Sequence, residues 1–358
     1  MWISSVCLAA TAALGWAQPP PQQPPPSHQR VASHRLRYRF AAGQTQRFVG
    51  RITGKLEVMV DPLPGLQLPS SLDLGVDGSY RLEQRVTGAR GGIATVTGSL
   101  TSANLEIKAK GTLETQQGQE TKTGRFIATM SSGRATHRLT GKWDDLPLER
   151  TLPVFLSPGG AALKVADNGR TLSAAGGPTL VIGGLLPPTQ AAQYFGSGLC
   201  GLANLEFPNR PVEIGETWDS VQERYVPVSR AGQKKAGAIP LTVTLAHTLQ
   251  SVRQTGGRQL ATVTTEGSIA LGKPEFRLGK TRLADASYTL AGQTVVDLKR
   301  GQIVRSTFDV LVSTQLAVDL EIRREGSDPL AKIEPIKQAV YMQVSGDLKY
   351  TLLPAAGR

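Results

Sequence analysis

Cysteine is almost absent from this chain, with only Cys7 and Cys200 among 358 residues. Cys7 lies in an N-terminal segment that we expect to be removed, so a disulfide within the mature chain is excluded. We interpret Cys200 as a small buried apolar residue, with a reactive thiol or an intermolecular bridge as the alternatives. The core and the sheet hydrogen bonds must therefore hold the fold together.

Aromatic residues and histidines are also few. Phe, Trp and Tyr make up 5% of the chain, and the four histidines are His28, His34, His137 and His247. No two of these histidines have metal-ligand spacing, so we predict no metal site and interpret them as satisfied or exposed side chains. Nucleic-acid binding would need clustered cations and stacking aromatics, and the sequence has neither, so we expect no such partner.

Recognisable catalytic motifs are missing as well, including G-x-S-x-G, H-E-x-x-H and the P-loop. Gly196, Gly198 and Gly201 spell G-x-G-x-x-G, but no strand-to-helix context surrounds them, so no nucleotide cofactor is expected. The adjacent acids Asp144 and Asp145 would point to opposite faces of a strand, which argues against a glycosidase pair. We predict a non-enzymatic protein without a cofactor, with an enzyme of unrecognised class as the alternative.

No apolar run is long enough to span a membrane as a helix. The best candidate, residues 3–14, falls short of the roughly 20 residues required and is followed by a proline tract. Residues 1–17 read instead as a secretory signal peptide, and residues 18–34 as a proline-rich linker in extended conformation. We expect an exported protein of the periplasm, the cell envelope or the extracellular space, without a transmembrane helix.

Glycine and proline are abundant, with 39 and 23 residues, and they separate long stretches in which apolar and polar residues alternate. Such alternation places successive side chains on opposite faces of a strand. It begins at Leu36 and is strongest in residues 48–60, 308–323 and 340–352. We predict that the last two stretches are antiparallel neighbours in a large curved sheet.

The apolar faces of these strands supply the candidate site residues, either as core positions or as contacts for a ligand. They are Gly50, Ile52, Gly54, Leu56, Trp218, Val312 and Leu316. Glycines on an apolar face indicate curvature or the close approach of another backbone, so we favour tight packing at Gly50 and Gly54. We interpret Trp218 as an anchor at the junction of two halves rather than as a ligand contact.

The second half of the chain repeats the first in outline. Residues 215–217 (G-E-T) match residues 43–45 (G-Q-T), and residues 260–264 (L-A-T-V-T) match residues 93–97 (I-A-T-V-T). Similar offsets in the same order argue for duplication of a β unit.

We therefore predict a mainly β fold made of two related, half-barrel-like units of long curved antiparallel strands. The first unit spans residues 35–187 and the second spans residues 208–354. A short helical connector at residues 188–207 joins them.

The order of segments resembles an uncharacterised bacterial envelope family of exported, internally duplicated β-sheet proteins, which is defined only as a domain of unknown function. The likeness rests on L-x-Y-x-F-x-x-G-x-T at residues 36–45, G-G-I-A-T-V at 91–96 and P-x-x-P-V-x-I-G-E-T-W at 208–218. It covers most of residues 36–352 and implies no active site. At the level of fold alone, the chain is also similar to the curved sheets of periplasmic lipoprotein carriers, which cradle acyl chains.

The formal net charge of +12 favours anionic partners such as lipid headgroups or acidic polysaccharide. The cations mostly alternate with apolar residues, as at Arg37 and Arg39, so we interpret most of them as solvated strand faces. The leading hypothesis is an exported, non-catalytic envelope protein that binds a lipid or another amphiphile on a concave sheet face. The alternative is a binder of anionic cell-wall or surface polysaccharide. The sequence does not determine the oligomeric state.

Overall fold

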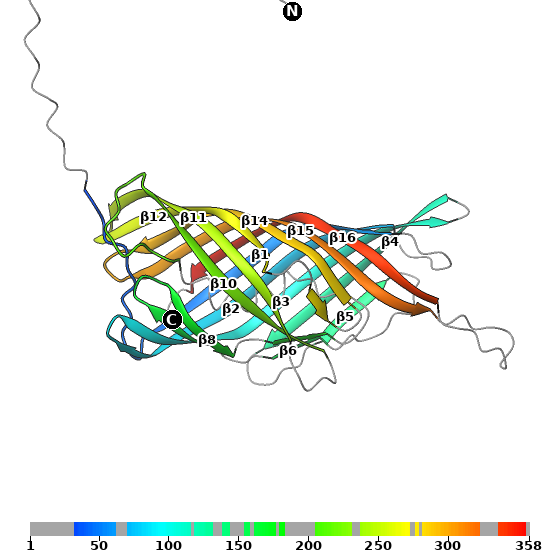
Figure 1. Ribbon diagram of the computed structural model, residues 1–358, viewed down its shortest axis with the longest axis horizontal. Coiled ribbons are helices and arrows are strands. Elements are labelled where there is room, and N and C mark those ends of the chain that lie inside the picture. The colour runs from blue at the N-terminus through cyan, green and yellow to red at the C-terminus, as the bar shows by residue number, and fades with distance from the viewer. Residues whose placement is uncertain are drawn as a thin grey trace, which may run out of the picture. The chain divides into compact units, whose positions relative to one another are not determined.

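One continuous sheet makes up most of the described protein (Figure 1). The computed structural model describes residues 32–61, 70–115, 118–131, 138–143, 154–157, 161–176, 179–182, 205–230, 237–272, 276–278, 281–322 and 336–355. Strands dominate these residues and no helix occurs among them, which confirms the predicted mainly β class. The signal peptide, most of the linker, most of the helical connector, Asp144, Asp145 and Cys200 lie outside the described residues.

Sixteen strands form the sheet. They are β1 Thr45–Val60, β2 Ser71–Arg90, β3 Ile93–Thr115, β4 Gly118–Ser131, β5 Arg138–Trp143, β6 Val154–Ser157, β7 Ala161–Ala166, β8 Thr171–Gly176, β9 Thr179–Ile182, β10 Thr217–Arg230, β11 Gly237–Thr255, β12 Arg258–Leu271, β13 Phe276–Leu278, β14 Thr281–Asp297, β15 Gln302–Ile322 and β16 Ile336–Pro354. The main path runs β5-β4-β3-β2-β1-β16-β15-β14-β12-β11-β10-β9-β6, and β7 pairs with β3 and β8. The β9–β10 pair is parallel.

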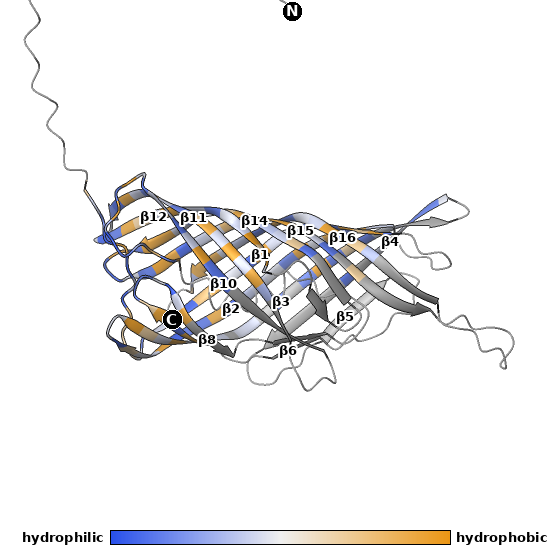
Figure 2. Ribbon diagram, viewed as in Figure 1, coloured by the Kyte–Doolittle hydropathy of each residue, from blue (hydrophilic) through white to orange (hydrophobic). Residues whose placement is uncertain are grey.

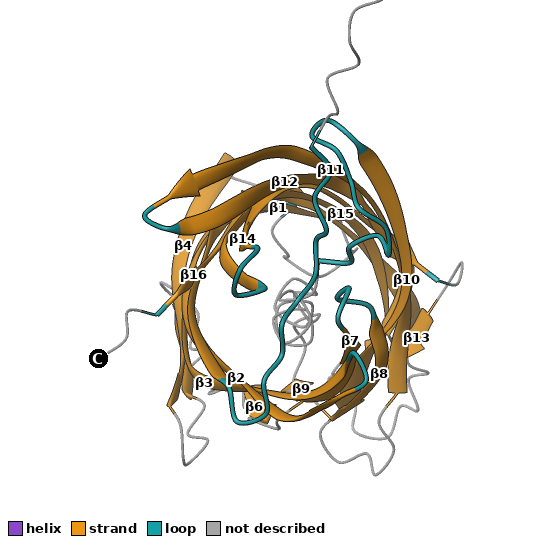
Figure 3. Cartoon of the chain, turned by 90° about the vertical axis from the view of Figure 1, so that its left-hand side faces the viewer, coloured by secondary structure: helices purple, strands orange, loops and turns teal. Residues whose placement is uncertain are grey.

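The two predicted units share this sheet because the first long strand pairs with the last. Ile52 of β1 lies opposite Gly78 of β2 on one side and opposite Tyr350 of β16 on the other. The predicted antiparallel pairing of β15 with β16 is confirmed, with Phe308 opposite Tyr350. Figure 3 looks along the roll of the sheet and shows that one face turns inward while the other turns outward.

The inward face is apolar and carries the core. One row of inward residues can be followed through the strand register across seven strands. It consists of Ala109, Leu74, Leu56, Gly346, Val312, Tyr288 and Ile269. All of these except Gly346 belong to one buried cluster. Most alternate positions carry polar side chains on the outward face, with some exposed apolar ones such as Leu311, so hydropathy alternates along the strands in Figure 2. The strand period of two thus separates the core from the solvated wall.

Glycines on the inward face let neighbouring strands and rings approach closely. A Cβ added at Gly50 would fall on the ring of Tyr80, and one at Gly54 would collide with the backbone of Asp347 and Leu348. The tight packing predicted at both glycines is therefore confirmed. The freed space is used by Tyr80, whose hydroxyl donates a 2.5 Å hydrogen bond to the Tyr350 hydroxyl.

The strand predicted to begin at Leu36 is not formed. Residues 34–40, which we call the strap, cross the ends of other strands instead of running beside one (Figure 3). His34 exchanges two backbone hydrogen bonds with Val212, at 2.7 and 2.9 Å, and the Tyr38 N–H donates to the Asp167 carbonyl at 2.6 Å. Buried and exposed side chains still alternate along the strap, because Leu36 and Tyr38 face a buried apolar cluster below it. Alternation of apolar and polar residues indicates that one side of a segment is buried and the other is exposed. A segment that crosses the ends of strands can meet this condition as well as a strand can.

Candidate anion-binding site at the end of the sheet

Several turns gather at one end of the rolled sheet because the strands that they join are antiparallel. They are residues 90–93 between β2 and β3, 167–170 between β7 and β8, 256–257 between β11 and β12, and 298–301 between β14 and β15. We call this region, together with the strap and residues 205–216, the turn end. Gly91 and Gly92 have φ angles of 60° and 76°, the left-handed values that a tight hairpin requires.

Two of these turns hold the strap from below. At Gly301 a Cβ would collide with the backbone of Tyr38 and Arg39, and at Gly169 it would meet the Tyr38 ring and the Leu205 carbonyl. Only glycine leaves room for such contact at these positive-φ positions. The β7–β8 and β14–β15 turns therefore position the strap and the arginines that alternate along it.

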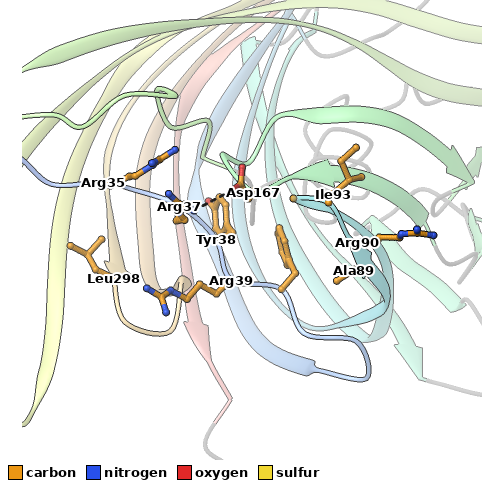
Figure 4. Close-up of a pocket in the computed structure, with 12 residues that line it drawn as sticks. Arg35, Arg37, Tyr38, Arg39, Ala89, Arg90, Ile93, Asp167 and Leu298 are labelled. Carbon is orange, nitrogen blue, oxygen red and sulfur yellow. Dashed lines mark ion pairs between the residues drawn. The ribbon is translucent and has the colours of Figure 1, made fainter.

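A pocket of about 730 Å³ lies between the strap and the β2–β3 turn (Figure 4). Its charged lining consists of Arg35, Arg37, Arg39, Arg90 and Asp167. Its apolar lining includes Phe40, Ile93 and Leu298. Three of the arginines come from the strap and the fourth comes from the end of β2, so the pocket exists only where the strap crosses the hairpin.

The arginines of the pocket are poorly compensated by acids. Arg37 pairs with Asp167 at 3.8 Å, with both side chains partly exposed. Arg35, Arg39 and Arg90 form no ion pair with any residue that the structure describes. Guanidinium groups offer planar pairs of N–H donors that match carboxylate and phosphate oxygens. The pocket is therefore suited to an anion.

The floor of the pocket is aromatic and uncharged. The Tyr38 ring stacks on Phe207 with centroids 5.0 Å apart and on Phe40 at 5.6 Å. Burial raises the pKa of the Tyr38 hydroxyl far above its usual value, so the side chain stays neutral. The Tyr38 side chain therefore adds no negative charge to the pocket, whose one acidic lining residue is Asp167.

The excess of cations extends over the whole turn end. Its basic residues are Arg35, Arg37, Arg39, Arg90, Arg170, Arg210, Lys299 and Arg300. Its acidic residues are Asp167, Glu206, Glu213 and Glu216. The Glu216 carboxylate accepts a hydrogen bond from the Glu213 N–H and pairs with Arg210, and both contacts lower its pKa. Two bases for each acid give this end a positive field.

The seven residues predicted from the sequence lie elsewhere. Ile52, Leu56 and Val312 are buried on the inward face, in β1 and β15. Gly50 and Gly54 pack in β1 as described above. The backbone of Leu316 pairs with Met342 in β16, and its side chain lies outside the described part. The structure brings Leu56 and Val312 into one cluster and places Ile52 in another.

Trp218 is also a packing residue, in the buried cluster below the strap. Its indole Nε1–H donates to the Glu206 carbonyl at 2.8 Å, and its ring lies 5.6 Å from that of His247. That bond ties the start of β10 to the segment that precedes it. Trp218 is thus a buried packing residue at the start of β10.

His247 forms a buried polar cluster on the inward face. Its Nε2 lies 2.9 Å from the Ser220 hydroxyl and its Nδ1 lies 2.9 Å from the Thr265 hydroxyl. Burial lowers its pKa to about 4, against an opposing effect of the Asp219 charge, so the ring is neutral. A Ser–His contact can activate a nucleophile, but Ser220 is buried too. We interpret the cluster as a satisfied polar part of the core.

The arginine pocket was not predicted, because the alternating arginines of the strap were interpreted as the solvated face of a strand. Alternating R-L-R-Y-R at residues 35–39 does mark one exposed side of the segment. Nothing local indicates that Arg90, more than fifty positions later, lines the same pocket. The spacing of the arginines on a two-residue period was the available clue.

No protein-family model matches this sequence, and no curated protein matches it. Within the described ranges, no helix has the length and apolar character needed to cross a membrane. The same ranges contain no group of three or more His, Cys, Asp or Glu side chains able to hold a metal ion.

Proposed function

We propose that this is an exported, non-catalytic protein of the cell envelope that binds an amphiphile with an anionic headgroup. The N-terminal segment with the character of a signal peptide supports export. The observation that carries the binding proposal is the pocket whose Arg35, Arg39 and Arg90 lack acidic partners among the described residues. The headgroup is assigned to these arginines.

The apolar lining favours an amphiphile over a small inorganic anion. Phe40, Ile93 and Leu298 border the arginines, and Ile93 is 44% exposed. A ligand with an acidic head and a short apolar part would remove these side chains from water while it neutralises the guanidinium groups. The inward face is a weaker candidate, because its apolar side chains are already packed in the core.

The proposal is tested by isothermal titration with a water-soluble short-chain phosphatidate, using the matching phosphatidylcholine as the zwitterionic control. Replacing Arg39 or Arg90 by Gln should weaken phosphatidate binding by about ten- to a hundredfold, since a hydrogen bond to a charged group contributes roughly 1.5–3 kcal/mol. Arg81→Gln is the matched control, because Arg81 is exposed on the outward wall in β2. Equal binding by wild type, Arg39→Gln and Arg90→Gln would rule out the pocket.

An acidic polysaccharide is the second candidate, favoured by the spread of cations over the turn end. Binding to such a polymer depends on many weak ion pairs and needs no apolar contact. A polyuronate should then bind more tightly than the phosphatidate, and Ile93→Ser should leave its affinity unchanged. The opposite ranking supports the amphiphile.

We also infer that the two halves arose by duplication. Similar backbone geometry at corresponding turns of the two halves supports this inference. Gly43 and Gly215 precede β1 and β10 with φ angles of 82° and 89°. The turns at residues 91–92 and 256–257 are both double glycines with positive φ. An experimental structure in which β1–β3 and β10–β12 fail to superimpose would contradict the inference.

A further inference from the structure

Exposed apolar side chains occur among the cations of the turn end. Ile93 starts β3 and is 44% exposed, Leu172 in β8 is 49% exposed, and Ile214 in the turn before β10 is 49% exposed. Ile93 lies directly opposite Arg90 in the register, and Leu172 follows Arg170 by two residues. Apolar tips and basic groups therefore share the same end of the sheet.

The outward wall has a different character, because its charges compensate one another. Arg47 pairs with Glu83 at 2.8 Å, Arg51 with Asp77 at 3.1 Å, and Arg125 with Glu106 at 2.9 Å. Each of these pairs joins adjacent strands. The wall is thus close to neutral over these strands, whereas basic residues outnumber acidic ones two to one at the turn end.

We propose that the turn end docks on an anionic lipid bilayer, with its arginines against the headgroups and with Ile93, Leu172 and Ile214 inserted at the interface. This combination of basic groups and apolar side chains is typical of proteins that lie on membranes. The proposal rests on the proposed function, since the arginines that hold a headgroup in the pocket also face the bilayer.

The shape of the turn end favours a bilayer over a protein partner. The three apolar tips come from separate turns and from the starts of separate strands. A stable protein interface needs a contiguous, closely packed apolar centre. A fluid layer of lipid headgroups does not need a contiguous apolar centre, because lipids rearrange around each separate apolar side chain.

The test is cosedimentation of the full chain with vesicles of phosphatidylcholine alone and of phosphatidylcholine mixed with phosphatidylglycerol. Wild type should bind the mixed vesicles, bind phosphatidylcholine weakly, and dissociate as salt is raised. The double variant Ile93→Ser, Ile214→Ser should bind the mixed vesicles about tenfold or more weakly, because two aliphatic side chains leave the interface. Leu311→Ser is the matched control, since Leu311 is 60% exposed on the outward wall, and it should bind like wild type.

The outcomes separate this inference from the proposed function. If the double variant binds the mixed vesicles as well as wild type, insertion of the apolar tips is overturned. If the chain binds soluble phosphatidate but not the mixed vesicles, bilayer docking is wrong while the arginine pocket stands. If it binds neither, both proposals fail. Circular dichroism of each variant checks that the exposed substitutions leave the fold unchanged.

Discussion

Burial controls the ionisation of the His247 side chain in the acid pH range. Both ring nitrogens are engaged by hydroxyls and no surface of the residue reaches solvent. Protonation would place a charge in the core, and burial therefore lowers the pKa of the residue from 6.5 to about 4. The unfolded chain takes up the proton more readily than the folded chain does.

Stability should accordingly fall as the pH is lowered through this window. The contribution is complete well above pH 6.5, where neither state is protonated, and about 3 kcal/mol is lost by pH 4. Urea denaturation at several pH values measures it. In His247→Gln this part of the pH dependence should disappear, whatever the variant's stability at neutral pH. If the slope of stability against pH were the same in His247→Gln as in wild type, carboxylates would account for the acid sensitivity instead.

The inward glycines give a second test at the same scale. Gly50→Ala puts a methyl group on the Tyr80 ring and should cost roughly 1–3 kcal/mol through overpacking. Gly75→Ala, whose new methyl would lie 3.9 Å from its nearest neighbour, should change stability by less than about 0.5 kcal/mol. Thermal denaturation compares the two. Equal midpoints would show that Tyr80 moves aside freely.

Burial of single residues was largely predictable, and their wider surroundings were not. The period of two correctly assigned Ile52, Leu56 and Val312 to an apolar face. The same period correctly placed Arg37 and Arg39 on the opposite side from Leu36. Alternation is a property of one segment, however, and the approach of Arg90 to the strap depends on a separate hairpin.

The strap is the element whose role differs most from its sequence pattern. It makes few backbone hydrogen bonds, and its attachment depends on the side chains of Leu36 and Tyr38 in the cluster below. Those contacts also place Arg35, Arg37 and Arg39 at the pocket. Anion binding and docking of the strap should therefore be lost together.

Leu36→Ala tests that dependence. Leu36 is 2% exposed, so truncation should cost about 2–4 kcal/mol and leave a cavity below the strap. It should also weaken phosphatidate binding although Leu36 does not line the pocket. Arg35→Ala, which changes an exposed neighbour, should affect binding but barely change the denaturation midpoint. A stable Leu36→Ala variant would mean that the strap contributes little to the fold.

At the scale of the whole molecule, the two predicted units depend on each other. β1 is bonded along its length to β2 and to β16, which are far apart in sequence. Either half alone would therefore expose a long edge strand to solvent. Exposed edges of this kind lead to aggregation.

The fragments 35–187 and 208–354 should consequently aggregate when each is expressed separately. Coexpressed, they should copurify, because the β1–β16 pairing can form between two chains. Size-exclusion chromatography distinguishes the cases. A monomeric 208–354 fragment with its own cooperative unfolding transition would show instead that the halves are independent domains.

The sequence alone determined the class of structure, the faces of the long strands and the pairing of β15 with β16. These follow from local alternation and from turn residues, which act over a few positions. Only the tertiary structure decided that both halves share one rolled sheet, that residues 34–40 cross its end, and that Arg90 joins the strap arginines. Such contacts depend on how a twisted sheet curves and on which distant edges meet, and the alternation within a strand carries no information about either.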